Sequence, residues 1–178
     1  MPDDSDLLVR LRDGDGDALR QLYSLYKHDL LTVATCLLAD APAAEDVLHD
    51  VIVTLAASAG RLRIRGSLRS YLVACVANRA RDEYRRRAVQ EVPLEDIEVP
   101  SAEAEPIRTA MDGEDAELLR QALLRLPYEQ REVITLHLHG DLTFREIARQ
   151  QEISINTATS RYRYGLDRLR TILTGVPT

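Results

Sequence analysis

The 178-residue sequence lacks features that would place it in several common classes of protein. It has no tryptophan, one phenylalanine and two cysteines, Cys36 and Cys75, which lie far apart within apolar helical patterns. This arrangement favours buried reduced thiols over a disulfide or a metal-binding pair. No apolar run approaches the roughly 18 residues that span a bilayer, and the acidic start lacks the order of a signal peptide. We therefore expect a cytoplasmic protein with no membrane insertion.

Motifs for catalysis and for cofactor binding are also missing. Glu45 and His49 are four residues apart and could share a metal ion, but a carboxylate-bridged helical site needs a second such cluster. His137 and His139 are two apart, so a helix would point them to different faces. No Ser/His/Asp or Cys/His arrangement and no glycine-rich phosphate loop stands out. We expect no catalytic residues, no metal, no cofactor and no enzyme.

Charge is distributed unevenly along a chain whose formal net charge is −6. Residues 61–87 contain nine arginines and two acidic residues, and residues 154–170 contain four arginines and one aspartate. Between these segments, residues 88–113 contain seven acidic residues and one arginine. Basic segments of this density indicate surfaces that contact nucleic-acid phosphates, although the whole chain is acidic.

Apolar residues recur at helical spacing in two blocks, and no long stretch alternates as a β-strand would. The first block covers residues 5–87 and the second covers residues 114–173. Residues 88–113 contain three of the seven prolines, no apolar periodicity and like charges that repel. The predicted fold is therefore all-α, with two small helical domains joined by a flexible acidic linker.

The second block ends in a pattern that is typical of a helix-turn-helix. In LTFREIARQQ, Thr143 and Glu146 have the spacing of a capping box at the start of a short helix. A tight turn then leads into SINTATSRYRYGLDRLR, whose apolar residues share one side of a longer helix. A recognition helix needs polar side chains and arginines on its other side, to contact bases and phosphates. That side carries Asn156, Thr157, Thr159, Ser160, Arg161 and Arg163.

Both blocks resemble the extracytoplasmic-function (ECF) group of sigma-70 family bacterial RNA polymerase sigma factors. In the first block, the resemblance lies in AEDVLHDVIVTL and GSLRSYLVACVANRARDEYRRR. In the second, it follows LPYEQREVITLHLHGDLTFREIARQQEISINTATSRYRYGLDRLR nearly end to end. A helix-turn-helix alone is shared by many regulators, so the resemblance depends on the two blocks in this order with an acidic linker between them.

The resemblance implies a sigma region 2-like domain over residues 5–87 and a region 4-like helix-turn-helix domain over residues 114–173. The helix around residues 42–58 would dock on core polymerase through Asp46, Val47, Asp50 and Val51. The minus-ten promoter element would be bound by Arg61, Arg63, Arg65, Asn78, Arg79, Arg81, Arg85, Arg86 and Arg87. The minus-thirty-five element would be read by the six residues of the recognition helix.

The implied partners are core RNA polymerase and promoter DNA, an anti-sigma factor is left open as a third, and no obligate homo-oligomer is expected. Two alternatives stay open: a free-standing helix-turn-helix regulator, and a sigma-like interaction module without initiation activity. The sequence also departs from the family pattern. It lacks the aromatic residue that is usual near Ala56, and it has Ala158 and Thr159 where valine and lysine are common. These departures bear on promoter opening and recognition.

Overall fold

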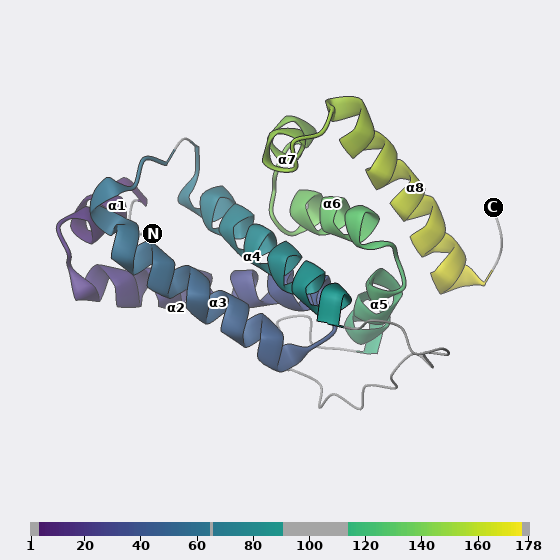
Figure 1. The fold of residues 1–178 in the computed structure, drawn as a ribbon, viewed down its shortest axis with the longest axis horizontal. Coiled ribbons are helices and arrows are strands. Elements are labelled where there is room, and N and C mark those ends of the chain that lie inside the picture. Colours follow the sequence, from purple (N-terminus) through teal and green to yellow (C-terminus); the bar gives the residue numbers. More distant parts are fainter. Residues whose placement is uncertain (1–3, 65, 91–113, 176–178) are drawn as a thin grey trace.

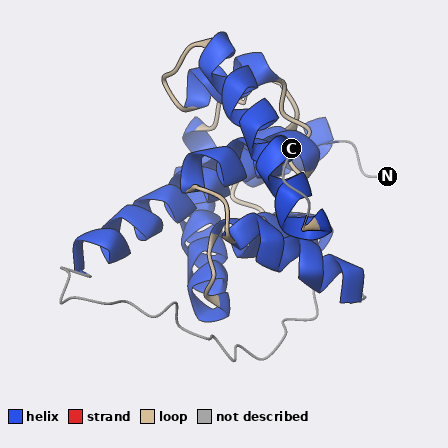
Figure 2. Cartoon of the chain, turned by 90° about the vertical axis from the view of Figure 1, so that its right-hand side faces the viewer, coloured by secondary structure: helices blue, strands red, loops and turns tan. Residues whose placement is uncertain are grey.

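The computed structural model describes residues 4–64, 66–90 and 114–175, and these form helices and connecting turns with no strand (Figures 1 and 2). The first block contains α1 (Asp4–Arg12), α2 (Gly16–Leu37), α3 (Ala41–Ser58), the 3-10 turn η1 (Ala59–Arg61) and α4 (Leu68–Gln90). The second contains α5 (Glu114–Leu124), α6 (Tyr128–Leu138), α7 (Phe144–Gln150) and α8 (Ile155–Thr174). The all-α prediction is confirmed. The predicted linker begins inside α4, and its remainder, residues 91–113, lies outside the described residues.

Polar side chains at the helix starts explain several helix boundaries. Asp40 accepts a hydrogen bond from the backbone N–H of Ala43 and caps α3. At the start of α7, Thr143 and Glu146 form the capping box that their spacing predicts. Ser154 accepts from the backbone N–H of Thr157 and begins α8. Each cap satisfies a helical N–H group that would otherwise lack a partner.

The two blocks pack against each other and share one apolar core. α6 lies against both α2 and α4, and α5 also contacts α2 (Figure 1). The shared core contains Val33 of α2, Val73 of α4 and Leu136 of α6, all of them fully buried. Cys36 of α2 is buried in a second cluster that includes Leu123 of α5. The helical spacing of the sequence predicts the two blocks but not this packing between them.

Polar contacts accompany the apolar ones between the blocks. Arg69 of α4 donates to Asp29 of α2 at 3.0 Å, to Asp141 at 2.7 Å and to the backbone carbonyl of His139 at 2.7 Å. Gly140 makes this approach possible, because a Cβ atom there would lie 2.8 Å from Cγ1 of Val73. The turn after α6 is therefore fitted closely to α4.

The cysteine prediction agrees with the structure. Both thiols are free, with Cys36 buried and Cys75 partly buried. Burial raises the pKa of Cys36 to about 11, which keeps this thiol protonated at neutral pH. Within the described ranges, no helix is long and apolar enough to cross a membrane, and no group of three or more potential metal ligands occurs.

Candidate polymerase and nucleic-acid interfaces

The predicted polymerase-docking residues of α3 divide between the surface and the core. Asp46 is exposed, and Asp50 is partly buried beside Arg79 of α4, whose Nε lies 3.0 Å from its Oδ2 atom. Val47 and Val51 are only 3% and 7% exposed and belong to the shared apolar core. In this structure the carboxylates of Asp46 and Asp50 lie on the outer face of α3, and the two valines pack this helix against the rest of the first block.

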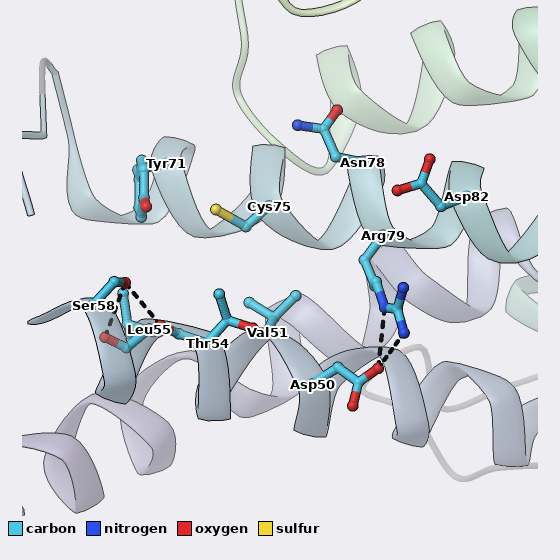
Figure 3. A pocket seen from close by; sticks show the side chains of 10 residues that line it. All are labelled: Asp50, Val51, Thr54, Leu55, Ser58, Tyr71, Cys75, Asn78, Arg79 and Asp82. Carbon is cyan, nitrogen blue, oxygen red and sulfur yellow. Dashed lines mark hydrogen bonds and ion pairs between the residues drawn. The ribbon is translucent and has the colours of Figure 1, made fainter.

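A groove runs between α3 and α4 and encloses about 280 Å³ (Figure 3). The Asp50–Arg79 ion pair links its two walls, as the dashed lines in Figure 3 show. Burial raises the pKa of Tyr71 in this groove to about 12. The apolar side chains in its lining are Val51, Leu55, Tyr71 and Cys75, and Asn78 lies beside them. Two predicted minus-ten residues, Asn78 and Arg79, thus line the same groove as the predicted docking residue Asp50.

The remaining predicted minus-ten arginines lie in different surroundings. Arg61, Arg63 and Arg85 are exposed, whereas Arg65 lies outside the described residues. Arg86 and Arg87 both donate to Glu83, and their hydrogen bonds hold the pKa of Glu83 below its ordinary value. Arg87 also pairs with Asp40 at 2.8 Å. Arg81 forms an ion pair with Glu132 of α6 at 2.6 Å. Among the ion pairs of the described residues, it is the one in which a predicted minus-ten arginine binds a residue of the second block.

The recognition helix α8 exposes most of the predicted minus-thirty-five residues. Asn156, Thr157, Thr159 and Arg163 are exposed, and Ser160 and Arg161 are partly buried. The guanidinium of Arg163 lies 5.1 Å from the ring centre of Tyr164, an exposed aromatic residue that the sequence reading did not select. Of the departures from the family pattern, Ala56 and Thr159 are exposed and Ala158 is fully buried. The helix therefore presents its polar side outward, as the pattern predicts.

An aromatic cluster and a glycine position α8 on the rest of the second block. The rings of His137 and Phe144 stack at 4.4 Å, and Tyr162 of α8 meets both edge-on. A Cβ atom at Gly165 would lie 2.7 Å from Cδ1 of Ile134, so α6 and α8 approach closely at this point. These contacts fix the angle of the recognition helix.

The two basic surfaces meet at a cavity between the blocks. Arg81 and Arg85 of α4 and Arg161 of α8 line this cavity of about 330 Å³, together with Glu132 of α6. Burial raises the pKa of Glu132 above its ordinary value, and the charges of Arg81, Arg161 and Arg85 oppose that rise. The sequence reading missed Glu132, although its place four residues after Tyr128 puts both on one side of α6.

Comparison with known proteins covers both blocks. The family model for sigma-70 region 2 matches residues 22–89, and the model for sigma-70 region 4 matches residues 116–169. The chain is 31% identical over 172 residues to the ECF RNA polymerase sigma factor SigM of Mycobacterium tuberculosis, covering 96% of this chain and 84% of that protein. The chain belongs to the ECF group of the sigma-70 family. This sigma factor is also 34% identical over 129 residues to the ECF sigma factor RpoE of Cereibacter sphaeroides, covering 71% and 70% of the two chains.

Two solved structures share the fold of this sigma factor. The sigma factor RpoE of Bartonella quintana, in complex with the anti-sigma factor NepR, has a TM-score of 0.67 at 22% identity, covering 86% of this chain and 95% of that one. CnrH, in complex with the cytosolic domain of CnrY, has a TM-score of 0.68 at 20% identity, covering 97% of both chains. The match to region 2 excludes the free-standing helix-turn-helix regulator, because such a regulator lacks that region.

Proposed function

We propose that this sigma factor directs core RNA polymerase to promoters and aids promoter opening, with the work divided between its two blocks. The observation that carries the proposal is the presence of region 2 and region 4 in this order on one chain. The proposed partners are core polymerase, promoter DNA and an anti-sigma factor, since the sigma factor RpoE of Bartonella quintana, which shares this fold, is in complex with the anti-sigma factor NepR. The proposed place of action is the cytoplasm, and the sigma factor has no catalytic role of its own.

The proposed polymerase-docking surface is the outer face of α3. Asp46 is exposed there and Asp50 lies one turn further along, so their carboxylates can pair with basic residues of core polymerase. The ion pair between Asp50 and Arg79 has side-chain exposures near one half on both sides, so a partner can compete for either residue. Val47 and Val51 support this surface from beneath.

The proposed minus-ten surface is formed by the end of η1, the loop after it and α4. Arg61, Arg63 and Arg85 are exposed and free to approach a single strand whose phosphates each carry a negative charge. Asn78 and Arg79 add polar groups at the groove between α3 and α4. The proposed minus-thirty-five surface is the polar side of α8, where exposed Arg163 and partly buried Arg161 lie beside hydroxyl and amide side chains. Arg161 also lines the cavity between the blocks.

Transcription with purified core polymerase on genomic DNA fragments tests the function as a whole. We expect RNA with discrete 5′ ends that depend on this sigma factor, and the mapped ends would supply the promoter sequence. A complete absence of such products, with intact binding to core polymerase, would favour the interaction module without initiation activity.

The first prediction separates the two DNA surfaces on such a promoter. Arg161→Ala should reduce discrimination among upstream sequences by about 1–3 kcal/mol if this arginine pairs with a guanine. Arg85→Ala should slow promoter opening, since each base-pair step of stacking costs roughly 1.4 kcal/mol to separate. Run-off transcription on duplex and premelted templates measures both effects, and premelting should rescue Arg85→Ala alone.

Arg168→Ala is a matched control, because Arg168 is exposed on α8 beyond the residues proposed to read DNA. It should keep the sequence discrimination of the wild type. Equal rescue of the Arg85 and Arg161 variants by premelting would contradict the division of work between the two surfaces.

A further inference from the structure

We propose that Glu132 blocks access to Arg81 in the unbound sigma factor by taking the position of a DNA phosphate, and that promoter binding requires this contact to open. The proposal rests on the function proposed above and adds a mode of regulation to it. The contact joins the two blocks, so opening it also separates region 2 from region 4.

The first argument is the geometry of the pair. Arg81 donates to Glu132 through Nε at 3.0 Å and through Nη2 at 2.6 Å, which is the two-pronged arrangement that arginine also uses toward phosphate. The side chains are 16% and 3% exposed. A strand phosphate therefore cannot reach the guanidinium of Arg81 while Glu132 holds it.

The second argument is the set of arginines around the carboxylate of Glu132. The arginines whose charges act on its carboxylate are Arg81, Arg85 and Arg161. Two of them belong to the proposed minus-ten surface and one to the proposed minus-thirty-five surface, and all three line the same cavity. One buried carboxylate on α6 thus lies beside cations from both proposed DNA-binding surfaces, and it is paired with Arg81.

The third argument is the distance between the two promoter elements. The minus-ten and minus-thirty-five elements are about 25 base pairs apart, which corresponds to about 85 Å along the duplex. In the structure, Arg81 and Arg161 line one cavity of about 330 Å³. One chain cannot bind both elements in the packed arrangement described here.

The fourth argument is the nature of the contact between the blocks. Besides apolar side chains, it contains the Arg69–Asp141 ion pair and a hydrogen bond from Gln150 to the carbonyl of Ala74 at 3.2 Å. Water or DNA can replace the partners of these groups when the blocks separate.

The test compares Glu132→Gln with Glu129→Gln in the full-length chain. Glutamine keeps the shape of Glu132 but leaves the buried Arg81 without a counter-charge, which favours a state in which Arg81 reaches solvent or phosphate. We expect a larger radius of gyration in small-angle X-ray scattering, and at least tenfold tighter binding of a single-stranded minus-ten oligonucleotide without polymerase. Glu129→Gln removes the same charge from an exposed glutamate of the same cavity and should change neither value.

A second variant tests the proposal if Glu132→Gln does not fold, as a loss of its helical circular dichroism signal would show. Asp141 has a φ of 54°, which asparagine tolerates, so Asp141→Asn removes one of the two carboxylates that pair with Arg69, at little local cost. It alters none of the residues proposed to bind DNA, and it should move both readouts in the same direction by two- to fivefold.

The proposal is overturned if the folded variants keep either the wild-type radius of gyration or the wild-type affinity for the oligonucleotide. Transcription by wild type with core polymerase is measured in parallel. If wild type gives no promoter-dependent product, the proposed function fails; if it transcribes normally and the variants match it in either readout, only the masking by Glu132 fails.

Discussion

His139 links protonation to the stability of the chain. This residue is the C-cap that follows α6, and its backbone carbonyl accepts a hydrogen bond from Nη2 of Arg69 at 2.7 Å. Burial, and then the charge of Arg69, hold the pKa of His139 below its ordinary value of 6.5. The folded chain therefore favours the neutral imidazole, and the unfolded chain takes up the proton more readily.

We expect the free energy of unfolding to fall as the pH drops below 6.5 towards the folded pKa of His139, because the unfolded chain binds more protons in that range. His139→Gln should flatten this part of the curve. Urea titrations at pH 7.5, 6.5 and 5.5 measure it. His28→Gln, which replaces an exposed histidine of α2, should keep the wild-type dependence, and flattening in both variants would rule out His139 as the cause.

Single residues also show where the sequence was informative. The capping pair Thr143 and Glu146 was predictable because it depends on four consecutive residues. The burial of Val47 and Val51 was not, because helical spacing identifies an apolar side without indicating whether the chain or a partner covers it. Glu132 carried a weaker signal still, since a lone glutamate on an amphipathic helix is usually solvated.

Among the elements, α7 depends most on its ends. It has seven residues, Phe144–Gln150, and isolated helices of that length are not stable in water. Two supports compensate: the capping box at its start, and the stacking of Phe144 on His137. Because α7 packs against α8, its stability contributes to how firmly α8 is held, together with the contacts that α6 makes.

Thr143→Ala should lower the free energy of unfolding by about 1 kcal/mol, because the backbone N–H of Glu146 loses its acceptor. Chemical denaturation followed by circular dichroism measures the change. Thr54→Ala serves as the control, since Thr54 is exposed in the middle of α3 and caps no helix. A loss in the control as large as that in Thr143→Ala would show that the capping box has no specific role.

For the whole molecule, the arrangement of the two blocks was the part that the sequence could not predict. Cys36 was expected to be buried, and it is, but residues of α5 and α8 cover it. Apolar periodicity predicts that a side chain is buried, but it does not indicate which other segment of the chain covers that side chain. The predicted division at residue 87 also falls inside α4, which runs on to Gln90 because arginine and alanine are good helix formers.

Cys36 reports the packing of the blocks through its reactivity. In a Cys75→Ser variant, the remaining thiol should react slowly with Ellman's reagent at pH 8, because it is 2% exposed and its pKa is about 11. Core polymerase should accelerate the reaction at least tenfold if it separates the blocks. In the reciprocal Cys36→Ser variant, Cys75 lies in the α3–α4 groove and should not be accelerated. Identical Cys36 rates with and without polymerase would show that the blocks stay packed in the complex.

The Arg81–Glu132 pair joins two parts of one polypeptide, and this makes its occupancy independent of dilution. The connecting chain fixes the effective concentration of one block around the other, whatever the number of molecules in the cell. A complex between two chains dissociates as it is diluted, whereas this contact forms to the same extent in a single copy. A sigma factor with such a contact therefore has the same fraction of closed molecules at the lowest expression level as at the highest.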